Sequence, residues 1–501
     1  MIVSVARSAL QPKDTMKYLN DAGGRFKLPL KNDAGKTLCT LLWGDPLHEI
    51  EREGERIKVR ARRRIGWVPA SAVSDTGLLE IYVIDVGQGD GVLMRTPHDD
   101  AWHMIDAGIR AAEQMTRKGA ANFVRWKFID DLRSDRVTLR NMVLSHPDAD
   151  PYGGLIDLLC GVLPDGRSFG IEVQNFWHGG IGRFKDGDKL GAVRADTSLL
   201  PLPHAGFGIK PEAKFIVELL DGKTHFGRPK RAFASDFAAL AQRVGTVPKK
   251  VSSLSQADGW LPGYAPAPGA AAIRVLGPVA EKLAGGGQGL RWLGSESVTR
   301  NGHSLVLRVD YGQARVLLTG DLNTASQRLL LSCQPAAEFS VDVSKGCHHG
   351  SDDIDLRFVR AMAARATVIS SGDNEDYAHP RPRILGASAR YGREARAADG
   401  ELLPPLVYST ELARSVGLDF ASHARTVAAP QQPYEPAQLE VDFDDSPLGR
   451  YRRLSWMPMA TDLVYGLVNV RSDGRRILCA TMKEGSSDFD LQVFQAGVDA
   501  A

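Results

Sequence analysis

The stretch LSHPDADPYGGL, residues 144–155, constrains the fold of this chain more than any other. An apolar run ends there in His146, Asp148 and Asp150, and a glycine pair then opens a segment with helical character. The pattern predicts a strand that ends in a polar loop and continues into a helix. Alternate residues of an extended segment point the same way, so these three side chains share a face on which they can bind one divalent cation.

A purely structural interpretation explains the same residues. Asp150 can cap the N-terminus of the following helix, and Pro151 suits the first helical position. On its own, this stretch therefore leaves a capped helix and a metal-binding loop both open.

Three stretches further along the chain favour the metal site. RVLLTGD ends in Asp321, VDVSKGCHHGS contains His348 and His349, and TVISSGDNEDYAHP reaches His379. Each is an apolar run rich in β-formers that is followed by Asp or His. With the first stretch they make four strand ends, which we expect to meet and to present metal ligands together.

The order of the motifs resembles a known family. IYVIDVGQGDGVLMRTP, HMIDAG, LSHPDADPYGG, SLVLRVDYGQARVLLTGD, HHGS and YAHP follow one another as in metallo-β-lactamase-fold hydrolases of the competence-protein type, which are similar to the hydrolase domain of the DNA-uptake channel protein ComEC. The resemblance covers residues 80–385 approximately. It implies a mixed α/β fold, a four-layer αββα sandwich, with one or two metal ions in the cleft where the sheet ends meet. It does not fix a substrate.

The resemblance also implies site residues. The metal ligands carried over from the family are His146, Asp148, Asp150, Asp321, His349 and His379. Asp321 matches a bridging carboxylate, His348 is the alternative to His349, and His303 in NGHSLVL is a weaker candidate. Asp85 and Asp90 in DVGQGD match a motif whose carboxylate orients ligands rather than binding metal.

One position departs from the family pattern. Pro151 stands where the family usually has a histidine that holds a second metal, and a proline side chain has no lone pair to offer. The remaining set is rich in carboxylates, which favours manganese, with zinc next. We expect one or two ions, and the loss of a ligand can also leave a single ion or none.

The expected function is metal-dependent hydrolysis. A bound ion lowers the pKa of water toward ~7, which provides a nucleophile at neutral pH. Asp150 and Asp321 would hold the ion, and His349 or His379 would donate a proton to the leaving group if it does not bind metal. The family resemblance favours phosphodiesters, so a phosphodiesterase or nuclease acting on nucleic acid or a nucleotide comes first.

Two other functions stay open. One is a small-molecule metallohydrolase acting on lactones, thioesters or amides, which predicts an apolar pocket where a nuclease predicts a positive cleft. The other is a binding or scaffold protein with a degenerate site, which Pro151 makes conceivable.

We expect three domains. Residues 1–76, with the motif GWVPASAV, resemble a bacterial SH3-like barrel, a module that binds a protein or ligand partner. Residues 77–395 form the hydrolase domain, with an insertion at about 161–270 that contains a helix over 235–244. Residues 396–501 form a β-rich extension whose hairpin turns at Asp473 and Gly474 and pairs with an existing sheet or forms a small cap.

Composition bounds the setting. The net charge of +2 gives no overall attraction to nucleic acid, and the five cysteines are scattered without CxxC spacing, as in a reducing compartment. No apolar run approaches the ~18 residues of a membrane span, and the first residues lack the pattern of a signal peptide. We therefore expect a cytoplasmic protein without a membrane partner, unlike the competence channel itself.

Overall fold

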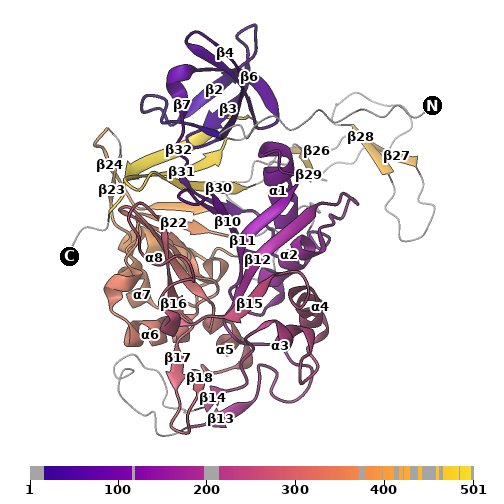
Figure 1. Cartoon of the computed structure of the whole chain (residues 1–501), viewed down its shortest axis with the longest axis vertical. Helices are drawn as coiled ribbons and strands as arrows, with labels where there is room; N and C mark the ends of the chain where they lie inside the picture. The colour runs from indigo at the N-terminus through magenta and orange to yellow at the C-terminus, as the bar shows by residue number, and fades with distance from the viewer. Residues whose placement is uncertain are drawn as a thin grey trace.

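The computed structural model describes residues 16–114, 119–196, 214–371, 379–397, 399–410, 417–420, 423–428, 438–442, 458–461, 466–483 and 486–497. Several stretches of the predicted C-terminal extension lie outside these residues. Two large β-sheets form the centre of the molecule, helices lie on their outer faces, and a small β unit sits at one end (Figure 1). Among the described residues, none of the helices has the length and apolar character that crossing a bilayer demands.

The larger sheet has nine strands, in the order β15-β12-β11-β10-β9-β8-β30-β31-β32. Their bounds are β8 Leu79–Ile84, β9 Gly91–Thr96, β10 Ala101–Ala107, β11 Arg136–Leu144, β12 Gly170–His178, β15 Lys250–Ser253, β30 Leu467–Ser472, β31 Arg476–Met482 and β32 Phe489–Gln495. Strand β11 is parallel to both β10 and β12. Its last four residues are buried, as expected for a central strand covered on both faces.

The smaller sheet has six strands, in the order β16-β19-β20-β21-β22-β25. Their bounds are β16 Ala272–Gly277, β19 Val306–Tyr311, β20 Ala314–Leu318, β21 Val343–Lys345, β22 Ala366–Ile369 and β25 Leu406–Ser409. Strands β20, β21 and β22 run parallel, so the residues that follow them emerge at one edge.

Three hydrophobic clusters show that the molecule has four layers. Val83, Val143 and Val368 belong to a cluster that combines strands of both sheets, so the sheets face each other. On the outer face of the nine-stranded sheet, apolar residues pack against α1 (Ala120–Arg125), α2 (Ala149–Cys160), α3 (Lys223–Gly227) and α4 (Ser235–Val244). On the outer face of the six-stranded sheet they pack against α6 (Thr324–Cys333), α7 (Leu356–Met362) and α8 (Pro382–Tyr391). The predicted αββα arrangement is confirmed.

The ends of the chain add β structure to this sandwich. Strands β1 (Lys17–Leu19), β2 (Lys27–Lys31), β3 (Thr37–Leu42), β4 (Pro46–Glu53), β5 (Arg56–Ala61), β6 (Arg64–Pro69) and β7 (Val73–Ser74) form a small unit with its own core. The assignment of this unit as SH3-like stays a prediction. Near the C-terminus, the hairpin β30–β31 turns at the predicted residues and pairs with β8, so the terminal element joins an existing sheet.

The stretch predicted as an insertion, residues 161–270, is only partly outside the core. It contains β12 and β15, which are strands of the nine-stranded sheet. Their apolar residues contribute to the hydrophobic clusters on the two faces of that sheet. The predicted helix over 235–244 is present as α4 and covers this sheet. Near it, β13 (Val193–Ala195), β14 (Lys214–Ile216), β17 (Ala280–Lys282) and β18 (Gln288–Arg291) form a small separate sheet beside α5 (Glu296–Gly302) (Figure 1).

Candidate metal centre

Segments that follow four strands meet where the two sheets approach each other. His146 follows β11, and Asp150 lies in the first turn of α2. Asp321 follows β20, and His348 and His349 lie in the short helical segment η6 (Cys347–Gly350) after β21. His379 lies between β22 and α8, with its ring centroid 5.9 Å from that of His348. The predicted convergence of the four strand ends is therefore present.

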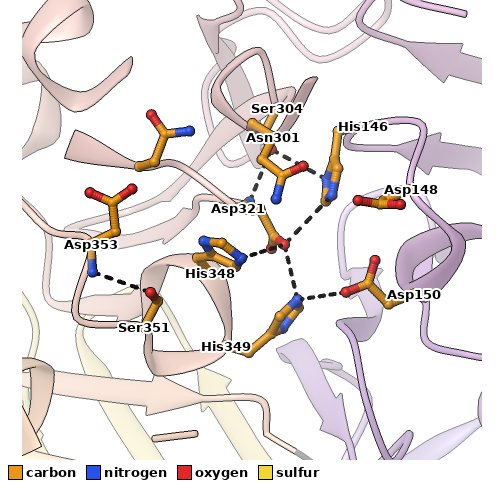
Figure 2. Close-up of polar contacts among 12 residues, drawn as sticks. His146, Asp148, Asp150, Asn301, Ser304, Asp321, His348, His349, Ser351 and Asp353 are labelled. Carbon is orange, nitrogen blue, oxygen red and sulfur yellow. Dashed lines mark hydrogen bonds and ion pairs between the residues drawn. The ribbon is translucent and has the colours of Figure 1, made fainter. Parts of the chain in front are cut away.

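Three imidazoles surround one carboxylate oxygen (Figure 2). Asp321 Oδ2 lies 3.0 Å from His349 Nε2, 3.5 Å from His146 Nε2 and 3.7 Å from His348 Nε2. Asp150 Oδ2 is 3.3 Å from the same nitrogen of His349. We call these five residues the histidine cage.

The deepest polar atoms of the cage lack hydrogen bonds. The side chains of His146 and Asp321 are 1% exposed and that of His349 is 5% exposed. Among the described residues, His146 Nε2, His349 Nε2 and both carboxylate oxygens of Asp321 have no partner with hydrogen-bond geometry. Burying such groups unsatisfied costs about 1–3 kcal/mol each. A group that accepts their lone pairs would remove this cost.

The spacing of these atoms fits a divalent ion. Donors bound tetrahedrally at about 2.1 Å lie roughly 3.4 Å from one another. The three nitrogen–oxygen separations of 3.0, 3.5 and 3.7 Å bracket that value. Imidazole and carboxylate are ordinary ligands of zinc and related metals. The donor set, its burial and its spacing therefore fit such a cation.

The charged groups of the cage shift one another's pKa values. Burial alone would raise the pKa of Asp321, but the imidazoles of His349, His146 and His348 hold it well below its usual range. Burial opposes the charge on His349, yet the carboxylates of Asp321 and Asp90 raise its pKa well above the usual value. The carboxylate of Asp321 and the imidazole of His349 thus stabilise each other's charged forms.

His379 lies in a different environment beside the cage. Burial, followed by the neighbouring imidazoles of His349 and His348, lowers the pKa of His379 to about 4. Its imidazole is therefore neutral at pH 7.

Neighbouring side chains hold the cage residues in place. Asp90 Oδ1 lies 3.1 Å from His349 Nδ1, which leaves Nε2 facing Asp321. The hydroxyl of Ser145 lies 2.9 Å from His146 Nδ1, and the hydroxyl of Ser304 accepts a hydrogen bond from the Asp321 amide at 2.9 Å. Such contacts fix the orientation of ligand side chains.

One buried lysine next to the cage was not among the site residues predicted from the sequence. Lys345, at the end of β21, contacts Asp90, donates to the Gly320 carbonyl at 3.1 Å and lies 4.0 Å from Asp321 Oδ1. The signal for it was a lone lysine within the apolar run VDVSKG. Its ammonium group supplies a fixed positive charge behind the carboxylates.

Asp148 has two arginine partners in addition to its place beside the predicted metal ligands. Its carboxylate binds Arg300 at 2.7 Å and lies 3.7 Å from Arg183, and it accepts a hydrogen bond at the start of α2. It remains close to the ligand atoms of His146 and Asp150. Two arginines, neither selected from the sequence, therefore occupy the carboxylate that we expected to bind metal.

The remaining candidates lie outside the cage. His303 Nε2 contacts the carbonyl of Arg291 at 2.7 Å, and burial lowers its pKa to about 4. Asp85 accepts a hydrogen bond from the Gly87 amide at 3.2 Å and shapes the loop that carries Asp90. Pro151 is buried in the first turn of α2.

The chain is similar to curated competence proteins over a short segment, and no protein-family model matches it. ComE operon protein 3 of Bacillus subtilis is 30% identical over 97 residues, which are 19% of this chain and 12% of that protein. Competence protein ComA of Neisseria gonorrhoeae is 33% identical over 98 residues, which are 19% of this chain and 14% of that protein. The chain thus matches about an eighth of the length of these relatives.

Three solved structures are also similar over 66% of this chain. Two of them are the metallo-β-lactamase fold protein YhfI from Bacillus subtilis (10% identity, TM-score 0.29, 96% of that chain) and a metal-dependent hydrolase of the β-lactamase superfamily (14%, 0.30, 95%). A diphosphatase from the PhnP family is similar at 10% identity and a TM-score of 0.27, over 94% of its chain. This chain therefore combines a four-layer mixed α/β fold with a short segment similar to competence proteins.

Proposed function

We propose that this chain is a metal-dependent hydrolase that cleaves phosphodiesters. The observation that carries the proposal is the histidine cage, in which buried nitrogen and oxygen atoms without hydrogen bonds converge on Asp321. Buried polar atoms that lack hydrogen bonds are costly to maintain, and a metal ion bound by these atoms would remove that cost.

His146, His348, His349, Asp150 and Asp321 would hold the ion. This set has three imidazoles, as many as the sequence suggested, but one carboxylate fewer, because Arg300 and Arg183 engage Asp148. We therefore place zinc ahead of manganese. When bound, such an ion supplies Lewis-acid chemistry, since it lowers the pKa of water and polarises the ester under attack.

The residues around the ion divide the remaining work. Asp90 and Ser145 keep the imidazoles of His349 and His146 oriented toward Asp321. His379 lies beside the cage, with its ring centroid 5.9 Å from that of His348. We assign His379 to proton transfer during hydrolysis.

The preference for phosphodiesters has two supports. The motifs between residues 80 and 385 resemble hydrolases of the competence-protein type. The two guanidinium groups next to the cage, Arg183 and Arg300, are of a kind that binds phosphate oxygens well. Esters without phosphate would gain less from them.

The test combines metal content with hydrolysis. Wild type, Asp321→Ala and the control Asp135→Ala are compared for bound metal by mass spectrometry and for cleavage of bis(p-nitrophenyl) phosphate and of oligonucleotides. Asp135 is exposed and pairs with its neighbour Arg136. We expect wild type and the control to bind metal and cleave, and Asp321→Ala to do neither. Metal binding without cleavage of any phosphodiester would overturn the substrate assignment, and absence of metal binding would overturn the whole proposal.

A further inference from the structure

A hollow of about 480 Å³ lies beside the metal centre. It is lined by Arg183, Phe184, Lys185, Lys189, Phe233, Ala234, Ser235 and Glu296. Two of its lining side chains contact residues next to the metal centre. Arg183 lies 3.7 Å from Asp148, and Glu296 lies 4.0 Å from Arg300, which itself binds Asp148 at 2.7 Å. A group in this hollow is thus one residue away from the motif that carries His146 and Asp150.

The lining is predominantly cationic. Three of its side chains, Arg183, Lys185 and Lys189, are positively charged, and Glu296 is the sole acidic side chain among its described lining residues. Asp236 lies 3.4 Å from Arg183 and neutralises part of that charge. Lys185 and Lys189 are exposed, and no ion pair is found for either within the described part of the chain. Both ammonium groups therefore face solvent next to the site, in a turn that also carries the exposed carboxylates of Asp186 and Asp188.

The backbone that carries these cations is fixed. The Phe184 amide donates to the Lys189 carbonyl at 2.8 Å, and the Lys185 amide donates to the Ala232 carbonyl at 2.9 Å. Below them, the buried rings of Phe184 and Phe233 lie 5.3 Å apart. The turn that presents both lysines therefore has a rigid aromatic base, so their stems start from defined positions.

We propose that this hollow binds a second phosphate group of the substrate, adjacent to the phosphodiester at the histidine cage. The inference rests on the proposed function and narrows its substrate class to polyphosphorylated molecules, such as a nucleic-acid strand or a nucleoside polyphosphate. Lysine binds phosphate as a point charge, and Ser235 adds a hydroxyl to the same lining. An isolated phosphodiester would leave this hollow unused.

The first measurement is binding, which does not depend on turnover. Fluorescence anisotropy with a single-stranded octanucleotide compares metal-free wild type, the double variant Lys185→Ala/Lys189→Ala and the control Lys36→Ala. Lys36 is an exposed lysine in the small β unit, outside the hollow. We expect about 10-fold weaker binding for the double variant. The slope of log K against log salt should become shallower by about 1.4, since each contact to a single-strand phosphate contributes about 0.7.

The second measurement separates the hollow from the metal centre. For the double variant, KM for the octanucleotide should rise at least about 10-fold more than KM for bis(p-nitrophenyl) phosphate, which carries a single phosphate. Competition by a nucleoside triphosphate against the octanucleotide distinguishes a nucleotide from a strand as the source of the second phosphate. If the protein cleaves both esters but the double variant behaves as Lys36→Ala does, the hollow is solvated surface and the inference is wrong. If wild type cleaves neither ester, the proposed function itself fails.

Discussion

Two buried polar clusters in this protein differ in how their charges are satisfied. One is the histidine cage. The other joins the small β unit, the nine-stranded sheet and the C-terminal hairpin, and consists of Asp45, Arg62, Glu80, Arg95, Lys127, Asp131 and Arg471. We call it the ion-pair joint. Most members of both clusters are buried, so burial does not distinguish them.

In the ion-pair joint each carboxylate contacts a cation of this chain. Asp45 binds Arg471 at 2.8 Å and Arg62 at 2.7 Å, and Lys127 binds Asp131 at 2.8 Å. In the histidine cage, Asp321 lies within ion-pair distance of His349 and Lys345, yet both of its oxygens lack hydrogen-bond partners among the described residues. Within the joint, Arg471 Nε is without such a partner, whereas in the cage four such atoms, those of His146, His349 and Asp321, lie together. A group of adjacent buried polar atoms without hydrogen bonds is the stronger indication of a ligand.

The largest loss of folding stability is expected when a residue of the ion-pair joint is replaced. Arg471→Met removes one of the two arginines that hold the buried Asp45, and breaking a buried ion pair costs up to about 3–5 kcal/mol. Urea denaturation of the metal-free protein would measure it. Metal content should not change, because Arg471 is not part of the cage.

Partial rescue provides the control for this experiment. The double variant Asp45→Asn/Arg471→Met removes the buried carboxylate together with one of its two cations and should regain part of the lost stability. A double variant as unstable as the sum of its single variants would show that the two residues do not act as a pair.

The next effect concerns the cage. If it binds a divalent ion, zinc at about 1,000 times its Kd should add about 4 kcal/mol to the free energy of unfolding. Asp321→Ala should remove this increment, while Arg471→Met should keep it. The measurement is thermal or urea unfolding with and without zinc. An equal zinc effect in Asp321→Ala would place the ion elsewhere.

A smaller effect is expected one contact away from the ion. Asp90 orients His349 through Nδ1, so Asp90→Asn should weaken zinc affinity about 10–100-fold without abolishing binding. Competition with a chromogenic chelator would give the zinc affinity. Asp99→Asn serves as the matched control, because Asp90 directly precedes strand β9 and Asp99 lies in the loop that follows it. Affinity unchanged from wild type would mean that the Asp90 contact does not position the ligand.

The smallest effect is expected in the pH dependence of folding stability at acidic pH. Burial alone would raise the pKa of Asp45, but Arg62 and Arg471 hold it far below its usual range. Asp45 therefore stabilises the fold above the unfolded-state pKa of about 3.9, and this contribution is lost as the pH falls toward the lower folded-state value. Stability between pH 4 and pH 2 should depend on pH more steeply in wild type than in Arg471→Met, by at most about 1.4 kcal/mol per pH unit. Equal slopes in a pH series of urea denaturations would contradict this role.

Much of the cage could be predicted from local pattern. A strand ending in His146 and Asp150, and another ending in Asp321, are visible because apolar runs stop abruptly at residues that bind metals. The four-layer fold was implied by the family resemblance. The C-terminal hairpin followed from the turn at Asp473 and Gly474.

Other features depended on contacts between distant segments. Both histidines of HHGS face Asp321, although the sequence offered them as alternatives. Asp148 turns to Arg300, which lies 152 positions away in the chain, and His303 turns to the carbonyl of Arg291. Strands β12 and β15 belong to the core sheet although they lie in the stretch predicted as an insertion.

The sequence by itself thus determined which residues stand at the strand ends and the chemistry that they offer. The tertiary structure decided which of these donors meet, which one is taken by arginines, and that Lys345 lies behind the carboxylates. The physical reason is that side-chain alternation is a local property of each strand, whereas the pairing of donors depends on how the two sheets pack and on which partner neutralises each buried charge.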